Sequence, residues 1–367
     1  MLDQDLGAWL RLTSTPGIGR VKARRLLAAF GWPSAVFDQT PSALEPVVGM
    51  ALAHRLLAPP SSDTQATLLN TQAWLAEAEN RHVVAVGDPA YPADLLETAD
   101  PPLLLYVLGQ LQVLNPTVHR LAVVGSRNPT AQGVENARQF ARALGEAGVC
   151  VVSGLSLGID AAAHQGALAG GGSTIAVVGT GLDRVYPRQH RDLAHAIAAN
   201  GALVSEYPIG TGPLAAHFPQ RNRIISGLSR GTLVVEAALK SGSLITARTA
   251  LEQGRDVYAI PGSIHAPQAK GCHELIKQGA QLVESAADIL GFDHPTTGAG
   301  PNTPKASPDQ EHAPLLAAMG HDPMGLDTLQ ARTGWSVEAL QASLLTLELE
   351  GRVQRLPGGL YAPLVRA

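Results

Sequence analysis

The stretch VCVVSGLSLGIDAAAHQGAL, residues 149–168, passes from a short run of β-forming residues through Ser-Gly into the pattern of a helix. The same passage recurs along the chain from about His82 onward. Strands that alternate with helices of ten or more residues are typical of a parallel sheet with helices on both faces. Several of the runs are nearly continuous Val, Ile and Leu, as expected for strands that are covered on both faces. The sequence therefore predicts an α/β fold with a doubly wound, mostly parallel sheet.

The strands of this sheet are expected at runs that end in or lead to Gly, Ser or Pro. They are HVVAVG, LLLYVLG, RLAVVGS, VCVVSG, STIAVVGTG, ALVSEYP, GTLVVEA, DVYAIPG and AQLVES. These runs assign residues 81–291 to one sheet domain.

Three further segments flank this sheet domain. Residues 1–80 read as helices separated by Gly and Pro turns. Residues 292–310 are rich in Pro, Gly, Thr and Ser and are expected to form a flexible linker. Residues 311–367 show three helical patterns followed by RVQRLPGGLYAPL, where Pro-Gly-Gly predicts a hairpin turn. Three helices and a hairpin predict a winged-helix-like domain.

Composition restricts the class of protein. The chain of 367 residues is 45% hydrophobic and 16% charged, with a net charge of −4. It is therefore not a globally basic nucleic-acid binder, but this net charge does not exclude a local basic groove. Two cysteines and 12 scattered histidines show no metal-ligand spacing, so neither a metal nor a cofactor is expected. The acidic N-terminus and the lack of a long apolar run predict a cytoplasmic protein without membrane insertion.

Polar and basic residues follow two of the predicted strands. Ligands of open α/β sheets bind at the carboxyl ends of the strands, where loops lead into helix N-termini. The loop after RLAVV holds Gly125, Ser126 and Arg127, and the loop after VCVV holds Ser153 and Gly154. Free N–H groups and the helix dipole favour phosphate there, and Arg127 adds a positive charge. The sequence therefore predicts an anion site at this edge of the sheet.

The segment FPQRNRIISGLSRGTLVVEAALKSGSLITA, residues 218–247, adds an aromatic residue and more cations. Phe218 and the Arg-Asn-Arg triplet are expected before a helix, and Lys-Ser-Gly-Ser follows the next strand. A ring that stacks bases beside cations that contact phosphates is how single-stranded nucleic acids are held. The cations Arg127, Arg221, Arg223 and Lys240 are expected at one edge of the sheet, with Arg188 as a further phosphate contact.

Three weaker patterns allow other interpretations. Ser156, Asp160 and His164 suggest a Ser/His/Asp triad, but no Gly-x-Ser-x-Gly elbow is present, so local bonding of the histidine is favoured. VVGTG, residues 177–181, lacks the third glycine of a dinucleotide fingerprint. TPGIGRVKARRLL, residues 15–27, resembles a helix-hairpin-helix turn, which either contacts DNA phosphates or only packs helices.

Taken together, VVGSRNPT, SGLSLGIDAAAH, VVGTGLDRVYP, FPQRNRIISGLS, VVEAALKSGSLITA and VYAIPG closely resemble the DNA-processing protein A family (DprA/Smf) over about residues 80–290. The resemblance implies an extended Rossmann-like sheet domain, a helical N-terminal domain of the SAM or helix-hairpin-helix type, and a winged helix. It also implies a non-enzymatic protein that binds and protects incoming single-stranded DNA and helps to load the RecA recombinase during natural transformation. Homodimers would form through the Rossmann-like domain. The implied DNA-binding residues are Ser126, Arg127, Ser153, Gly154, Phe218, Arg221, Asn222, Arg223, Lys240, Ser241, Gly242 and Ser243.

Two other classes of function stay open. Gly231, Thr232 and Glu236 echo the loop of nucleotide phosphoribohydrolases, which cleave an N-glycosidic bond, although the Pro-Gly-Gly of that loop is missing. A pure protein-interaction scaffold is the other class. It would leave the placement of Arg127 and Lys240 unexplained.

Overall fold

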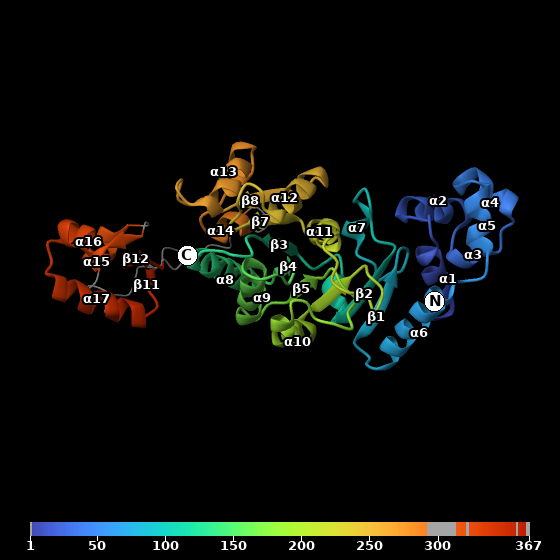
Figure 1. Ribbon diagram of the computed structural model, residues 1–367, viewed down its shortest axis with the longest axis horizontal. Helices are drawn as coiled ribbons and strands as arrows, with labels where there is room; N and C mark the ends of the chain where they lie inside the picture. The colour runs from blue at the N-terminus through green and yellow to red at the C-terminus, as the bar shows by residue number, and fades with distance from the viewer. Residues whose placement is uncertain (1, 292–312, 321–322, 357–358, 365–367) are drawn as a thin grey trace.

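The computed structural model (Figure 1) describes residues 2–291, 313–320, 323–356 and 359–364. Among these residues, nine strands form one sheet in the order β1-β2-β6-β5-β4-β3-β7-β8-β9. All nine predicted runs are strands of this sheet, so the predicted α/β fold is confirmed. The strands are β1 (Arg81–Ala85), β2 (Leu104–Gly109), β3 (Arg120–Val124), β4 (Cys150–Ser153), β5 (Thr174–Val177), β6 (Ala202–Ser205), β7 (Gly231–Val234), β8 (Asp256–Ala259) and β9 (Gln281–Leu282).

The winding of the sheet reverses at β3. This strand pairs in parallel with β4 on one side and with β7 on the other, and parallel pairing continues to β6 and to β9. At the other end of the sheet, β2 pairs antiparallel with β6, and β1 pairs antiparallel with β2. In a doubly wound sheet, the crevice at such a reversal is where ligands bind. A ligand site is therefore expected at the carboxyl ends of β3 and β7.

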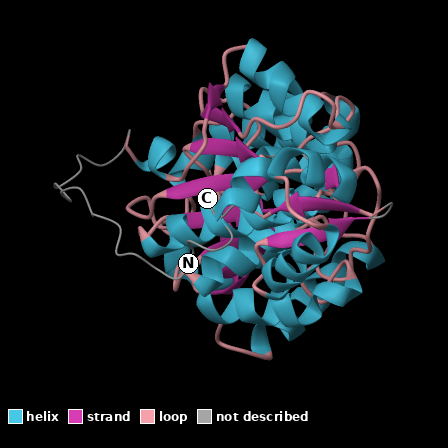
Figure 2. Cartoon of the chain, turned by 90° about the vertical axis from the view of Figure 1, so that its left-hand side faces the viewer, coloured by secondary structure: helices cyan, strands magenta, loops and turns pink. Residues whose placement is uncertain are grey.

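Helices cover both faces of the sheet, as Figure 2 shows for the strands in magenta between helices in cyan. Along β3, Ala122 and Val124 belong to one core cluster, whereas Leu121 and Val123 belong to the other. This alternation is why the strand reads as a continuous apolar run. The first face is covered by α7 (Ala93–Leu96), α11 (His217–Gly227), α12 (Gly242–Glu252) and α13 (Lys270–Lys277). The second face is covered by α8 (Ala131–Glu146), α9 (Ile159–Ala169), α10 (Arg191–Asn200) and α14 (Ala287–Leu290).

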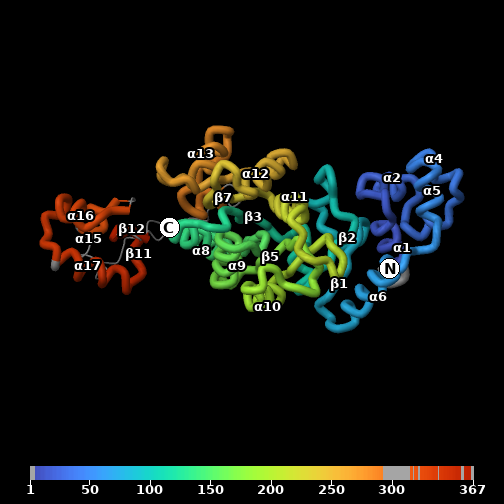
Figure 3. The backbone as a smooth tube through the Cα atoms, viewed as in Figure 1, coloured from blue at the N-terminus to red at the C-terminus, as the bar shows by residue number. Residues whose placement is uncertain are grey.

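The N-terminal segment is helical, as predicted. Its helices gather at the β1–β2 end of the sheet, in blue in Figure 3, and share a core with residues such as Tyr106 and Leu203 of that end. The predicted hairpin turn separates α1 from α2, with Gly17 at φ +89°. The helices are α1 (Leu2–Ser14), α2 (Arg20–Phe30), α3 (Pro33–Phe37), α4 (Pro41–Val48), α5 (Met50–Leu57) and α6 (Ser62–Ala76).

The C-terminal segment has its own core, which includes Leu315, Leu329, Leu340 and Tyr361. Its helices and strands are α15 (Ala313–Met319), β10 (Met324–Gly325), α16 (Leu326–Thr333), α17 (Val337–Leu349), β11 (Val353–Leu356) and β12 (Leu360–Pro363). The three helices and the β11–β12 hairpin confirm the predicted pattern, and β10 adds a third strand. The predicted linker at 292–310 and the turn residues 357–358 lie outside the described residues, and the domain boundaries stay predictions.

Candidate nucleic-acid interface

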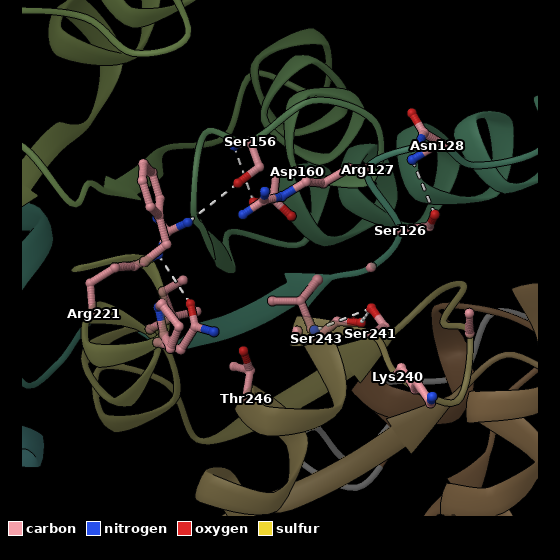
Figure 4. Close-up of a pocket in the computed structure, with 18 of the residues that line it drawn as sticks. Ser126, Arg127, Asn128, Ser156, Asp160, Arg221, Lys240, Ser241, Ser243 and Thr246 are labelled. Carbon is pink, nitrogen blue, oxygen red and sulfur yellow. Dashed lines mark hydrogen bonds between the residues drawn. The ribbon is translucent and has the colours of Figure 1, made fainter. Parts of the chain in front are cut away.

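A cavity of about 810 Å³ opens where the winding of the sheet reverses. Its walls come from the loops that follow the carboxyl ends of β3, β4, β5, β6 and β7. Figure 4 shows Ser126 and Arg127 on one wall and Lys240, Ser241 and Ser243 on the opposite wall. The predicted residues that line the cavity are Gly125, Ser126, Arg127, Phe218, Arg221, Asn222, Lys240, Ser241, Gly242 and Ser243.

The loop after β3 presents Arg127 at the cavity. Gly125 is needed at this point, because a Cβ atom there would lie 2.6 Å from Cγ1 of Ile159. Ser126 closes the loop on itself, since its Oγ accepts a hydrogen bond from the Asn128 amide at 3.1 Å. Arg127 is exposed and forms no ion pair with the described residues. The loop therefore holds one unpaired positive charge at the rim of the cavity.

Arg221 is a buried cation beneath the cavity. Its Nη1 donates to the carbonyl oxygens of Gly154, at 2.6 Å, and Val177, and its Nη2 donates to Ser156 Oγ at 3.3 Å. Burial lowers the pKa of the Arg221 guanidinium to about 10, an effect that the Asp160 carboxylate opposes. The side chain therefore stays charged at neutral pH and fixes the loop after β4 below the site.

The other arginine of the triplet points away from the cavity. The segment expected before a helix is helix α11 itself, which begins at His217. Two positions along a helix are about 200° apart. Arg223 therefore faces the opposite side from Arg221, where it pairs with Glu206 and lies 3.5 Å from Asp100. Of the two arginines, Arg221 lines the cavity with Lys240 and Arg223 does not, so a DNA contact by Arg223 stays a prediction.

Three other predicted residues also lie outside the cavity lining. Ser153 is fully buried, and its Oγ donates to the Val123 carbonyl at 2.7 Å, so it ties two strands together. Gly154 lies behind the cavity, where its small size leaves room for the Arg221 guanidinium. Arg188 is exposed on the short 3₁₀ helix η2 (Arg188–His190) rather than at the cavity wall.

The opposite wall is the start of helix α12. Ser241 is its N-cap residue, and its Oγ accepts a hydrogen bond from the Ser243 amide at 3.3 Å. The two serine hydroxyls are also bonded to each other at 2.7 Å. Lys240 precedes this cap, is exposed, and forms no ion pair with the described residues. A helix N-terminus with a free lysine beside it favours a phosphate group.

Two aromatic rings complete the cavity. Phe218 is half-buried, and the Arg127 guanidinium lies 5.8 Å from its ring centroid. Tyr186, from the loop after β5, lies beside it with 5.6 Å between ring centroids. The sequence reasoning missed Tyr186, together with the lining residues Asn128 and Thr246. The stretch VVGTGLDRVYP places the missed tyrosine in the loop that follows β5, and loops at this edge of the sheet are where lining residues are expected.

The predicted alternatives do not form in the cavity. His164 is fully buried, and its Nδ1 lies 2.7 Å from Thr174 Oγ1, so the suggested triad is absent from the described residues. Burial, with the charges of nearby His190 and Arg221, lowers the pKa of His164 to about 3. Glu236 accepts hydrogen bonds from the amide and hydroxyl of Thr130, at 2.9 and 2.5 Å, at the start of α8. The Glu236 carboxylate therefore caps the N-terminus of α8 through Thr130.

The N-terminal hairpin directs two of its cations toward the sheet domain. Arg20 lies 2.7 Å from Asp100 and 3.2 Å from Glu206, and Arg24 lies 3.5 Å from Asp100. These arginines join the helical segment to the ion pairs of Arg223. Packing between helices and the sheet domain is the role that the structure gives to this face of α2.

Metal-binding clusters and membrane-spanning helices are absent from the described residues. No cluster of three or more His, Cys, Asp or Glu side chains in them could hold a metal ion. No helix among them is both long enough and apolar enough to span a bilayer.

Comparison with known proteins places these features in a family. Residues 82–293 match the family model described as DNA recombination-mediator protein A, and residues 299–359 match the DprA winged helix domain. The Protein Smf of Escherichia coli is 44% identical over 381 residues, which cover 100% of this chain and 97% of that protein.

Two solved structures are similar in fold. DNA processing protein A from Streptococcus pneumoniae superposes with a TM-score of 0.66 at 38% identity, covering 77% of this chain and 95% of that chain. DNA processing protein A from Helicobacter pylori, described for its single-stranded DNA binding mode, gives a TM-score of 0.51 at 31% identity. That alignment covers 55% of this chain and 91% of the H. pylori chain.

Proposed function

Because this chain belongs to the DNA recombination-mediator protein A family (DprA/Smf), we propose that it binds single-stranded DNA in the cavity at the carboxyl ends of β3 and β7. This proposal rests on one observation. Cations that form no ion pair with the described residues line the same cavity as an aromatic ring. Arg127 and Lys240 stand on opposite walls (Figure 4), and the Phe218 ring lines the same cavity, 5.8 Å from the Arg127 guanidinium. Cations that follow the backbone and rings that stack bases are the two requirements for holding a single strand.

Each part of the cavity has a distinct task in this proposal. Backbone amides at the start of α12, with Lys240 beside them, receive one phosphate. Arg127 receives a neighbouring phosphate from the other wall. A base rests on the ring of Phe218. Arg221 lines the floor of the cavity, where its hydrogen bonds to Gly154, Val177 and Ser156 hold the loop beneath the site.

The proposed role is binding without turnover. Glu236, the residue on which a phosphoribohydrolase activity would depend, is bonded to Thr130 and does not line the cavity. Incubation with nucleoside monophosphates should therefore release no free base, whereas release that Glu236→Gln abolishes would establish the enzymatic alternative.

The wider role is to protect incoming single strands in the cytoplasm and to help load the RecA recombinase onto them during natural transformation. A homodimer formed through the sheet domain would place two cavities on one strand, which raises avidity without any new contact.

Anisotropy of labelled single- and double-stranded oligonucleotides tests the binding proposal. Nuclease digestion with and without the protein tests protection, and assembly of RecA on a coated strand tests loading. We expect strong preference for the single strand. Equal binding of duplex, or no binding, would refute the proposal.

A further inference from the structure

Tyr186 is an exposed aromatic residue in the wall of the cavity. Tyr186 is 47% exposed. Such exposure is notable because aromatic residues are scarce in this chain, which has six tyrosines and five phenylalanines. Within the described residues its hydroxyl has no hydrogen-bond partner, and its ring contact is with Phe218. An uncovered ring gains free energy when an apolar or aromatic face covers it. The exposed ring therefore points to a ligand with a flat face.

The geometry of the two rings indicates how many flat faces the cavity takes. The ring planes of Tyr186 and Phe218 are tilted by 47° to each other, with centroids 5.6 Å apart. Stacking requires a base to lie nearly parallel to the ring that it covers. A single planar base cannot lie flat on two rings that are tilted in this way. The two rings therefore offer stacking surfaces to two different bases.

The cations around the rings suit two linked nucleotides. Arg127 lies 5.8 Å from the centroid of Phe218, and Lys240 lines the same cavity from the opposite wall. Phosphates that link two bases stacked on these rings would meet a positive charge on either wall of the cavity. Stacking on a ring reads no base edge, because every base has a π-face.

We propose that Tyr186 is a second base-stacking residue and that the cavity binds two unpaired bases of one strand, one on Phe218 and one on Tyr186. The inference rests on the proposed function and extends it. It also supplies a reason for selecting single strands, since the faces of bases inside a duplex are covered by their neighbours. The same site should accept any base sequence.

The test compares Tyr186→Ala with Tyr186→Phe in the full chain, using anisotropy of a labelled mixed-sequence oligonucleotide. Loss of the ring should weaken binding roughly 5- to 150-fold, which corresponds to about 1–3 kcal/mol for one stacked base. The phenylalanine variant should bind like the unaltered protein. The dependence of affinity on salt should not change, because no charge is removed. Leu69→Ala, which truncates another exposed apolar side chain on α6, is the matched control.

A second measurement separates stacking from other effects of the substitution. An oligonucleotide that carries abasic sites in place of its bases should bind equally to the unaltered protein and to Tyr186→Ala. The fluorescence of 2-aminopurine in a normal strand should be quenched less by Tyr186→Ala than by Tyr186→Phe.

Each outcome decides the proposal. Unchanged affinity of Tyr186→Ala for the normal strand would overturn the second stacking site while leaving single-strand binding intact. An equal loss on the abasic strand would also overturn it, because the tyrosine would then act without a base. Failure of the unaltered protein to bind any strand would refute the proposed function and this inference together.

Discussion

The guanidinium of Arg221 lies against the backbone of Gly154 and donates to its carbonyl oxygen at 2.6 Å. A Cβ atom at position 154 would come within 2.5 Å of the guanidinium carbon. The glycine is therefore present for space, since its backbone must approach the arginine that fixes the loop beneath the cavity.

Gly154→Ala tests this contact. Overpacking of a buried site costs typically about 1–3 kcal/mol, so the free energy of unfolding should fall by that amount in urea denaturation. Gly242→Ala is the matched control, because a Cβ placed there meets no described atom within 4 Å beyond its chain neighbours and the nearby backbone of its own helix. A surface change of that kind should stay within about 0.5 kcal/mol. Equal stability of Gly154→Ala and the unaltered protein would show that the guanidinium moves aside freely.

Phe218→Ala should weaken single-strand binding by about 1–3 kcal/mol, because one base loses its stacking surface. Anisotropy at a fixed salt concentration measures this loss, and circular dichroism checks that the fold persists. Phe218→Tyr retains a ring and serves as the control. If Phe218→Ala binds as tightly as the unaltered protein, the ring belongs to the packing of α11 and not to the site.

Arg223→Ala should lower the free energy of unfolding without changing the affinity for DNA. Its partner Glu206 is only 7% exposed and also contacts Arg20, so loss of Arg223 leaves a nearly buried carboxylate with fewer partners. The cost of such an unsatisfied group is about 1–3 kcal/mol, and thermal or urea unfolding measures it. DNA affinity should stay unchanged, because this side chain lies outside the cavity. A strong loss of DNA affinity without a loss of stability would contradict this prediction and show that Arg223 contacts the strand.

Acid should destabilise the fold through His164. Its folded pKa is lowered to about 3 by burial, so the unfolded chain binds more protons than the fold below the ordinary histidine value near 6.5. The contribution of neutral His164 to the free energy of unfolding is therefore fully present above about pH 6.5 and is lost as the pH falls toward 3. Between pH 7.5 and pH 5 the loss should be about 2 kcal/mol from this residue. Urea unfolding of the unaltered protein and His164→Gln at both values measures it, and an equal acid loss in the two would contradict the assignment.

The strands could be predicted from the sequence because each is a short apolar run bounded by Gly, Ser or Pro, which is a local signal. The edge that carries the site followed from the parallel winding, since it places every loop after a strand at one end of the sheet. Gly125, Arg127 and Lys240 were found in this way, and the cavity unites them.

The direction of individual side chains could not be predicted in the same way. Arg221 and Arg223 were assigned together because helix α11 was expected to begin after them, whereas it begins at His217 and separates them by about 200°. Glu206, which holds Arg223 away from the cavity, is distant in sequence, so only tertiary structure reveals the pair. Tyr186 was missed because an aromatic residue in a loop has no periodic pattern to mark its exposure.

In the proposed complex, unpaired cations at the carboxyl ends of β3 and β7 hold the phosphates of a single strand. Lys240→Glu removes one of these cations, and Arg142→Glu on the exposed face of α8 is a control with the same change of charge. Anisotropy of one labelled single strand over a series of salt concentrations gives both affinity and salt dependence. For Lys240→Glu we expect weak binding and a log–log salt slope that falls by about 0.7, the value for one lost phosphate contact. Arg142→Glu should match the unaltered protein, whereas an unchanged affinity and slope for Lys240→Glu would contradict the account.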